Sequence, residues 1–233
     1  MSSVKGKGHC LSCPIRHLSI FAELPAERLQ QIQHFQPAVL QYQAGETIYH
    51  QGASAKSAYT LRKGMVKLTK SLANGRTQII RVVSAGELFG FDGFADEHYS
   101  HSATPLSSIE LCRLPFADLA QLKKQYAEID TAMTQRWLQY LRAAENQMLA
   151  LGVMKAPERL ASFLVNWYES GHLSSEGVAL PLARGEIGEL LGLTIETVSR
   201  FISEWKRQGF ISETKGHLNL LDKAGLLRAA CSD

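Results

Sequence analysis

The spacing of apolar residues changes once along the chain, near Phe116, and this change most restricts the possible folds. Between about Phe35 and Pro115, short β-branched runs alternate with glycine turns, and Asn74-Gly75 between two of these runs is a strong hairpin signal. Beyond Phe116, apolar residues recur at helical spacing. We therefore expect an α+β chain in which an antiparallel β-barrel or jelly roll precedes a helical part.

The longest helical pattern begins near Ala127, and no glycine interrupts it before Gly152. Its apolar residues follow the a/d spacing of a helix that packs against a partner helix. These residues are Trp137, Leu141, Ala144, Met148 and Leu151. The spacing predicts a dimerisation helix, and a core helix lying on the β-barrel is the alternative.

Composition and length restrict the class of protein. The chain has 233 residues, of which 45% are hydrophobic and 20% charged, as in soluble globular proteins and unlike disordered or collagen-like chains. No window approaches about 18 consecutive apolar residues, and the N-terminus is polar, so we expect a cytoplasmic protein without a membrane span. The length favours two domains. The predicted divisions are an N-terminal segment (1–34), a β-barrel sensor (35–126), a dimerisation helix (127–154) and a winged helix-turn-helix domain (155–233).

The most specific pattern lies in the last of these divisions, between Arg184 and Ser203. Two glycines occupy the places that a helix-turn-helix requires, with Gly188 where the helices approach closely and Gly192 where the turn needs a positive φ. The apolar residues that would form the inner faces of the helices are Ile187, Leu191, Leu193, Val198 and Phe201. The pattern predicts a helix-turn-helix, and a generic αα-hairpin is the alternative.

The second helix of this motif is predicted to run from Ile195 to about Gln208. If its apolar side faces inward, Glu196, Ser199 and Arg200 share the opposite face. Arginine can hold guanine O6 and N7 with two hydrogen bonds, glutamate can accept one from cytosine N4, and serine is a small adaptable partner. These three residues are the predicted base readers.

Contacts to the DNA backbone are predicted at the ends of this helix and in the hairpin that follows. Thr194 is the expected N-cap, Lys206 and Arg207 end the helix, and Lys215 lies at the hairpin turn. The formal net charge of +3 alone does not argue for nucleic acid. The prediction therefore rests on local placement of the charges.

The order of glycine-rich β part, long helix and winged helix-turn-helix resembles the Crp/Fnr superfamily of bacterial transcription regulators over nearly the whole chain. The residues from Ile195 to Arg200 (Ile-Glu-Thr-Val-Ser-Arg) are similar to the recognition helix of its oxygen-responsive Fnr branch. The resemblance implies a homodimer, a palindrome with TTGAT-type half-sites, and RNA polymerase as a further partner.

In the cyclic-AMP branch of this superfamily, a Gly-Glu-Leu turn and an Arg-Ser pair grip the nucleotide phosphate. Here Gly86-Glu87-Leu88 is present, but the pair is His101-Ser102. A neutral histidine replaces a bidentate guanidinium poorly, so cAMP is not expected as a ligand.

The Fnr branch carries a [4Fe-4S] cluster on three N-terminal cysteines and one from the barrel. Cys10, Cys13 and Cys112 match three of these positions, and Ser19 stands at the fourth. A serine hydroxyl is a poor iron ligand. Four interpretations stay open: a cluster with a fourth ligand from His9, His17 or Ser19, a thiol redox pair, a zinc site, or cysteines without a present role.

No catalytic motif such as a P-loop, G-x-S-x-G or HExxH occurs, which argues against an enzyme. We therefore expect a sequence-specific DNA-binding transcription regulator that responds to oxygen or redox state. The alternatives are a regulatory barrel that senses another small molecule without a metal cluster, or a module that binds protein instead of DNA.

Overall fold

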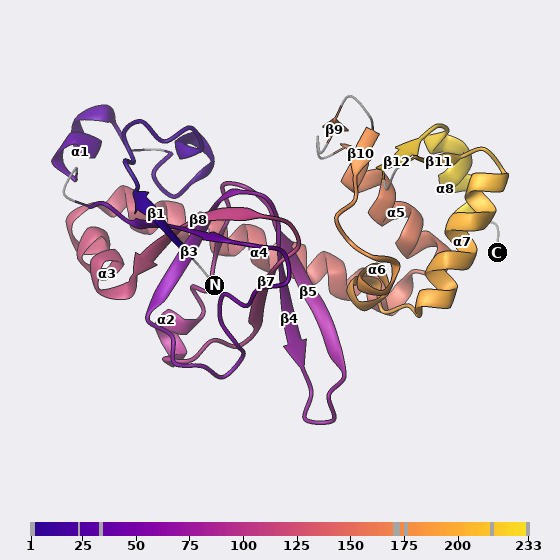
Figure 1. The fold of residues 1–233 in the computed structure, drawn as a ribbon, viewed down its shortest axis with the longest axis horizontal. Coiled ribbons are helices and arrows are strands. Elements are labelled where there is room, and N and C mark those ends of the chain that lie inside the picture. Colours follow the sequence, from indigo (N-terminus) through magenta and orange to yellow (C-terminus); the bar gives the residue numbers. More distant parts are fainter. Residues whose placement is uncertain are drawn as a thin grey trace. The chain divides into compact units, whose positions relative to one another are not determined.

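A computed structural model describes residues 3–22, 24–32, 35–169, 173–174, 177–214 and 217–231. The chain forms two compact units, Met1–Arg142 and Ala143–Asp233 (Figure 1). The α+β class is confirmed, with antiparallel sheets in the first unit and a helix-turn-helix in the second.

The N-terminal unit is built on two antiparallel sheets of five and three strands. One buried cluster contains residues of both sheets, which agrees with the jelly-roll form of the expected β-barrel or jelly roll; among the described residues the two sheets do not join into one closed barrel. The five-stranded sheet contains, in spatial order, β1 (Ser3–Lys7), β2 (Ala38–Tyr42), β8 (Ile109–Pro115), β3 (Ser57–Lys63) and β6 (Leu88–Phe89). The three-stranded sheet contains β5 (Thr77–Val83), β4 (Val66–Ser71) and β7 (Ser102–Pro105).

The predicted hairpin joins β4 to β5, with Ser71 opposite Thr77 next to the turn. Gly75 has a φ of 82°, and the Asn74 side chain accepts a hydrogen bond from the Arg76 amide at 3.1 Å. The turn therefore uses glycine and asparagine for the reasons that make this pair a hairpin signal.

Helical segments fill the rest of the N-terminal unit. They are the 3-10 helix η1 (Arg16–Leu18), the helices α1 (Ala26–Gln31), α2 (Gly93–Asp96) and α3 (Phe116–Gln125), and the part of α4 (Ala127–Val153) before the unit boundary at Arg142. The long helix expected from Ala127 is α4, which has 27 residues. Its first turns bury Ile129, Ala132 and Met133 in the core, whereas all five residues of the predicted a/d seam are exposed, including Leu141 (54%) and Met148 (72%).

The C-terminal unit has the arrangement of a winged helix-turn-helix. Its elements are α5 (Ala156–Glu169), β9 (Leu173–Ser174), β10 (Gly177–Ala179), α6 (Arg184–Leu191), α7 (Ile195–Arg207), β11 (Ile211–Thr214), β12 (His217–Leu220) and α8 (Lys223–Cys231). The strands form one sheet in the order β11-β12-β10-β9, and the hairpin predicted on either side of residues 215–216 is the β11-β12 pair.

The turn between α6 and α7 depends on its two glycines. Gly192 has a φ of 63°, which favours glycine, and the Gly192 amide donates to the Gly188 carbonyl. A Cβ on Gly188 would lie 2.5 Å from the Leu193 carbonyl oxygen. The turn therefore leaves no room for a side chain at Gly188.

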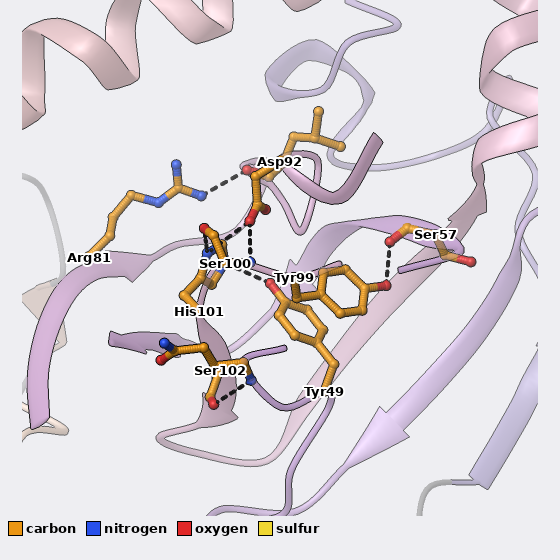
Figure 2. Close-up of polar contacts among 10 residues, drawn as sticks. Tyr49, Ser57, Arg81, Asp92, Tyr99, Ser100, His101 and Ser102 are labelled. Atoms are coloured by element: carbon orange, nitrogen blue, oxygen red, sulfur yellow. Dashed lines mark hydrogen bonds and ion pairs between the residues drawn. The ribbon is translucent and has the colours of Figure 1, made fainter. Parts of the chain in front are cut away.

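Aromatic side chains fill the interior of the N-terminal unit (Figure 2). The rings of Tyr49 and Tyr99 stack with centroids 3.7 Å apart (Figure 2), and the ring centroid of Tyr59 lies 5.7 Å from that of Tyr49. The Tyr99 hydroxyl donates to the Ser57 carbonyl at 2.7 Å. These rings belong to a buried cluster that includes residues from both sheets.

His101 lies at the polar end of this aromatic cluster and is only 6% exposed (Figure 2). The Tyr49 hydroxyl lies 2.8 Å from Nε2 of His101, and Nδ1 lies 3.3 Å from the Asp92 carboxylate. Burial alone would raise the pKa of Asp92, but hydrogen bonds from His101 and from the Ser100 amide hold the pKa of that carboxyl well below its usual range. Both ring nitrogens of His101 therefore already have a polar partner within the chain.

The close approach at Gly188 gives a stability prediction. Gly188→Ala should lower the free energy of unfolding by about 1–3 kcal/mol, because the new Cβ overpacks a rigid backbone turn. Gly185→Ala on the same helix is the matched control, since its Cβ would find its nearest neighbour at 3.9 Å. That control should be neutral or slightly stabilising. Urea denaturation of both variants tests this, and equal effects would contradict it.

The Asp92 contacts predict a pH dependence of stability. A carboxyl whose pKa is depressed by folding stabilises the fold above its unfolded pKa of about 3.9, and this stabilisation is lost as the pH falls through the folded value. Asp92→Asn should therefore be less stable than the parent at pH 7 by about 1–3 kcal/mol, and the gap should narrow below pH ~4. The exposed Asp96→Asn is the control. A gap in unfolding free energy that stays constant between pH 7 and pH 3 would contradict the assignment.

Candidate functional site

The recognition helix α7 is fixed at its start by the predicted N-cap. Thr194 has an extended backbone (φ −83°, ψ 158°), and its side chain accepts a hydrogen bond from the Thr197 amide at 3.3 Å. The inner face of the helix is buried, as the sequence predicted: Val198, Phe201, Ile202 and Trp205. This burial determines which side chains α7 presents to solvent.

The predicted base readers lie on the outer face of α7. Glu196 and Arg200 are exposed, and Ser199 is half-buried between them. Hydrogen bonds from its own backbone amide and from Thr194 hold the pKa of Glu196 below its usual range, so its carboxylate is an acceptor at neutral pH. The Arg200 guanidinium lies 4.9 Å from the ring centroid of Phe201. The face thus offers one ionised acceptor and one cationic donor.

The residues predicted to contact the DNA backbone differ in exposure and in their ion pairs. Arg207 is exposed at the end of α7, and Thr194 is exposed at its start. Lys206 is paired with the Glu213 carboxylate at 2.9 Å, which Arg184 also approaches at 3.0 Å. Sequence reasoning missed this ion pair, because Glu213 comes from the next strand. The predicted contact at Lys215 lies outside the described residues.

The three predicted ligand cysteines line one small cavity of about 20 Å³. Cys10 and Cys13 belong to the N-terminal loop, and Cys112 stands on β8 between Val39 of β2 and Thr60 of β3. Burial raises the pKa of Cys10 to about 12 and that of Cys112 to about 11. The fourth cysteine, Cys231, is exposed near the end of α8. The structure thus brings the predicted trio to one place.

The fourth position of the expected cluster is occupied by a hydroxyl that already has two partners. Ser19 is 6% exposed, and its Oγ donates to the Arg16 carbonyl at 2.8 Å and accepts from the Phe21 amide at 3.2 Å. His9 and His17, the other candidates, are exposed and do not line the cavity. Among the described residues, no three His, Cys, Asp or Glu side chains are placed to hold a metal ion together. The residues as they lie do not fit a four-thiolate cluster.

Sequence reasoning also missed the residues that join the Gly86-Glu87-Leu88 turn to α4. The Arg81 guanidinium donates to the Leu88 carbonyl at 2.9 Å and lies 4.0 Å from the ring centroid of Tyr140. The Tyr140 hydroxyl accepts a hydrogen bond from the Leu88 amide at 3.1 Å. These residues are far apart in the sequence, and no local pattern signals their contact.

No helix in the described part of the chain is both long and apolar enough to cross a membrane. The barrel part of the chain matches the cyclic nucleotide-binding domain family over residues 39–126, and residues 158–229 match the Crp-like helix-turn-helix domain family. The matched ranges lie within residues 35–126 and 155–233, respectively.

Curated relatives cover almost the whole chain. The nitrogen fixation regulation protein FixK of Bradyrhizobium diazoefficiens is 29% identical over 225 residues, which are 95% of this chain and 94% of the relative. The fumarate and nitrate reduction regulatory protein of Escherichia coli is 28% identical over 225 residues, which are 95% and 90% of the two chains. These relatives are regulators, and the prediction that the chain is not an enzyme is confirmed.

Solved structures have the same fold. FixK2 from Bradyrhizobium japonicum has a TM-score of 0.75 at 28% identity and covers 84% of this chain and 98% of its own. A Crp/Fnr-family regulator from Thermus thermophilus has a TM-score of 0.69 at 25% identity and covers 83% of this chain and 98% of its own. Because both domain families, the curated relatives and the solved folds agree, the chain belongs to the Crp/Fnr family of DNA-binding transcription regulators.

Proposed function

We propose that this regulator is a homodimer that reads a TTGAT-like palindrome through Glu196, Ser199 and Arg200, and that oxygen or redox state controls its activity. The observation that carries the proposal is the division of α7 into a buried face and an outer face with an ionised acceptor beside a cationic donor. A helix that docks in the major groove needs such a face near its N-terminal end.

The chemistry of the outer face supports base reading over general attraction to phosphate. Arg200 suits the O6 and N7 acceptors of guanine, and Glu196 suits the N4 donor of cytosine. A carboxylate in the first turn repels phosphates, so its presence there fits a role in specificity. Thr194, Lys206, Arg207 and Lys215 supply the proposed backbone contacts, and RNA polymerase is the protein partner that the family resemblance implies.

The proposed dimer rests on the exposed seam of α4. Soluble proteins rarely leave a row of large apolar side chains in water without a partner. The row is formed by Trp137, Leu141, Ala144, Met148 and Leu151. Two half-sites about 34 Å apart need two copies of the recognition helix, and pairing of two chains through this row would supply them.

The proposed signal is oxygen or redox state, and the sensing groups are Cys10, Cys13 and Cys112. A [4Fe-4S] cluster is the cofactor that the resemblance implies, but its donor set is one thiolate short, and Ser19 is held by hydrogen bonds within the chain. Cyclic AMP is not the proposed ligand, because His101 is bonded to Tyr49 and Asp92 and offers no free guanidinium-like fork.

The seam leads to a prediction about assembly. Replacing Leu141 and Met148 together by Glu should give monomers in light scattering, because four like charges would then meet across the two-fold axis. Affinity for the palindrome should fall by about 100-fold or more, since the two half-sites are no longer linked. Introducing the same charges at two exposed residues on the opposite side of α4, Gln139→Glu with Asn146→Glu, is the control and should leave the dimer intact. A stable dimer after the seam change would remove α4 from the interface.

The outer face of α7 leads to a prediction about specificity. Arg200→Ala should cost about 1–3 kcal/mol per half-site on the palindrome, with a much smaller loss on unrelated DNA. Glu196→Ala should relax the preference at one cytosine while total affinity stays similar or rises, because a charge that repels phosphates is removed.

Arg207→Ala supplies the contrast, since loss of a phosphate contact weakens matched and mismatched sites equally and flattens the salt dependence. The measurement is affinity at fixed salt for the matched palindrome and for single-mismatch versions. If all three variants lose the same amount on every sequence, this face of α7 does not read bases. Absence of salt-dependent DNA binding in the parent would instead favour a module that binds protein.

A further inference from the structure

Cys10 and Cys13 are the first and last residues of a tight turn in the N-terminal loop. The Cys13 amide donates to the Cys10 carbonyl, with 3.4 Å between nitrogen and oxygen. A hydrogen bond between residues i+3 and i defines a β-turn, in which the first and last Cα atoms lie within about 7 Å. Disulfides span Cα separations of about 4.4–6.8 Å. Both cysteine side chains also line the same small cavity. The turn therefore holds the two thiols within reach of a disulfide.

We propose that Cys10 and Cys13 form a reversible disulfide by exchange with a low-molecular-weight disulfide of the glutathione type. The proposal rests on the redox response proposed above and specifies its chemistry. A disulfide also explains why a serine can stand at position 19. A dithiol switch requires only two cysteines, so the Ser19 hydroxyl can hydrogen-bond within the adjoining turn.

The exchange balances in two steps. Cys13 is the first nucleophile, because burial disfavours the thiolate of Cys10. The Cys13 thiol loses its proton, and its sulfur attacks the small disulfide, forming a mixed disulfide and releasing one small thiolate. The second thiol then loses its proton and attacks the protein sulfur of the mixed disulfide, which forms the Cys10–Cys13 bond and releases the second small thiolate. Two protein thiols are oxidised and one small disulfide is reduced to two thiols.

A disulfide between Cys10 and Cys13 is favoured over one that includes Cys112, because the sulfur atoms must move together to form the bond. Cys112 is fixed in the middle of the five-stranded sheet, where β8 pairs with β2 and β3 on either side. In contrast, Cys13 lies in a loop, and Leu11 and Ser12 between the loop cysteines are exposed, so Cys13 can approach Cys10 without breaking strand pairing.

The end of the loop is attached to the proposed dimerisation helix. Arg136 of α4 donates a hydrogen bond to the Leu18 carbonyl. The Leu18 side chain fills the space beside Gly86, where an added Cβ would lie 2.3 Å from the Leu18 Cβ. The same glycine turn is held to α4 through Leu88 and Tyr140. Tightening of the loop can therefore reach α4 through Leu18.

The test uses the full-length chain equilibrated with mixtures of reduced and oxidised glutathione, then alkylated and digested with trypsin. Cleavage after Lys7 and Arg16 leaves both loop cysteines in one peptide, whereas Cys112 lies in another. The expected result is that the Gly8–Arg16 peptide escapes alkylation under oxidising conditions and is lighter by two hydrogen atoms. Cys13→Ser should abolish this product, and Cys231→Ser should leave it unchanged.

Three results would overturn the proposal: a peptide linked through Cys112, a glutathione adduct that never resolves, or iron with acid-labile sulfide bound by the anaerobically purified chain. Affinity for the palindrome is measured on the same samples. It should differ by at least about fivefold between the two states in the parent and not in Cys13→Ser. A chain that forms the disulfide but binds the palindrome in neither state contradicts the proposed function and supports the disulfide.

Discussion

The C-terminal unit depends on the close approach of α6 and α7 at Gly188. Because a Cβ there would lie 2.5 Å from the Leu193 carbonyl, only glycine lets the two helices meet with this turn. Their meeting buries Val198, Ile202 and Trp205 of α7. Once these residues face inward, the helical period places Glu196, Ser199 and Arg200 outward. The contact between α6 and α7 at Gly188 thus determines which side chains α7 presents to DNA.

In the N-terminal unit, the residues that the resemblance aligns with phosphate-binding positions, His101 and the Gly86-Glu87-Leu88 turn, make contacts within the chain. Stacked tyrosines fill the interior, and His101 closes their polar end together with Asp92 (Figure 2). The Gly86-Glu87-Leu88 turn is retained, but it is bound to Tyr140 of α4 on one side and packed against Leu18 on the other. A turn that serves ligand binding in the cyclic-AMP branch here joins the cysteine loop to the long helix.

The sequence predicted the features whose signals are local. The Asn74-Gly75 hairpin, the glycines of the helix-turn-helix, the Thr194 cap and the length of α4 follow from short patterns with a steric cause. The strand Ser3–Lys7 was not foreseen, because an exposed edge strand needs no apolar alternation and forms by pairing with β2. The helix α8 was also missed. It packs against α5, and its pattern is short.

In the candidate site, too, the sequence predicted the features that have local signals and missed those that depend on spatial neighbours. The outward residues of α7 follow from helix periodicity, and the cysteine trio follows from family spacing, but the Lys206–Glu213 pair and the bonds of Ser19 depend on three-dimensional neighbours. These neighbours change the interpretation. Lys206 is ion-paired with Glu213, and the Ser19 hydroxyl makes two hydrogen bonds within the chain.

The proposed dimer reads two half-sites in fixed register through two copies of α7. The most direct test is affinity for the TTGAT-type palindrome before and after insertion of about half a helical turn between the half-sites, which rotates them to opposite faces of the duplex. The half-turn insertion should reduce affinity to the level of unrelated DNA, and a full-turn insertion should restore part of it. Equal affinity for the original and the half-turn palindromes would contradict the claim.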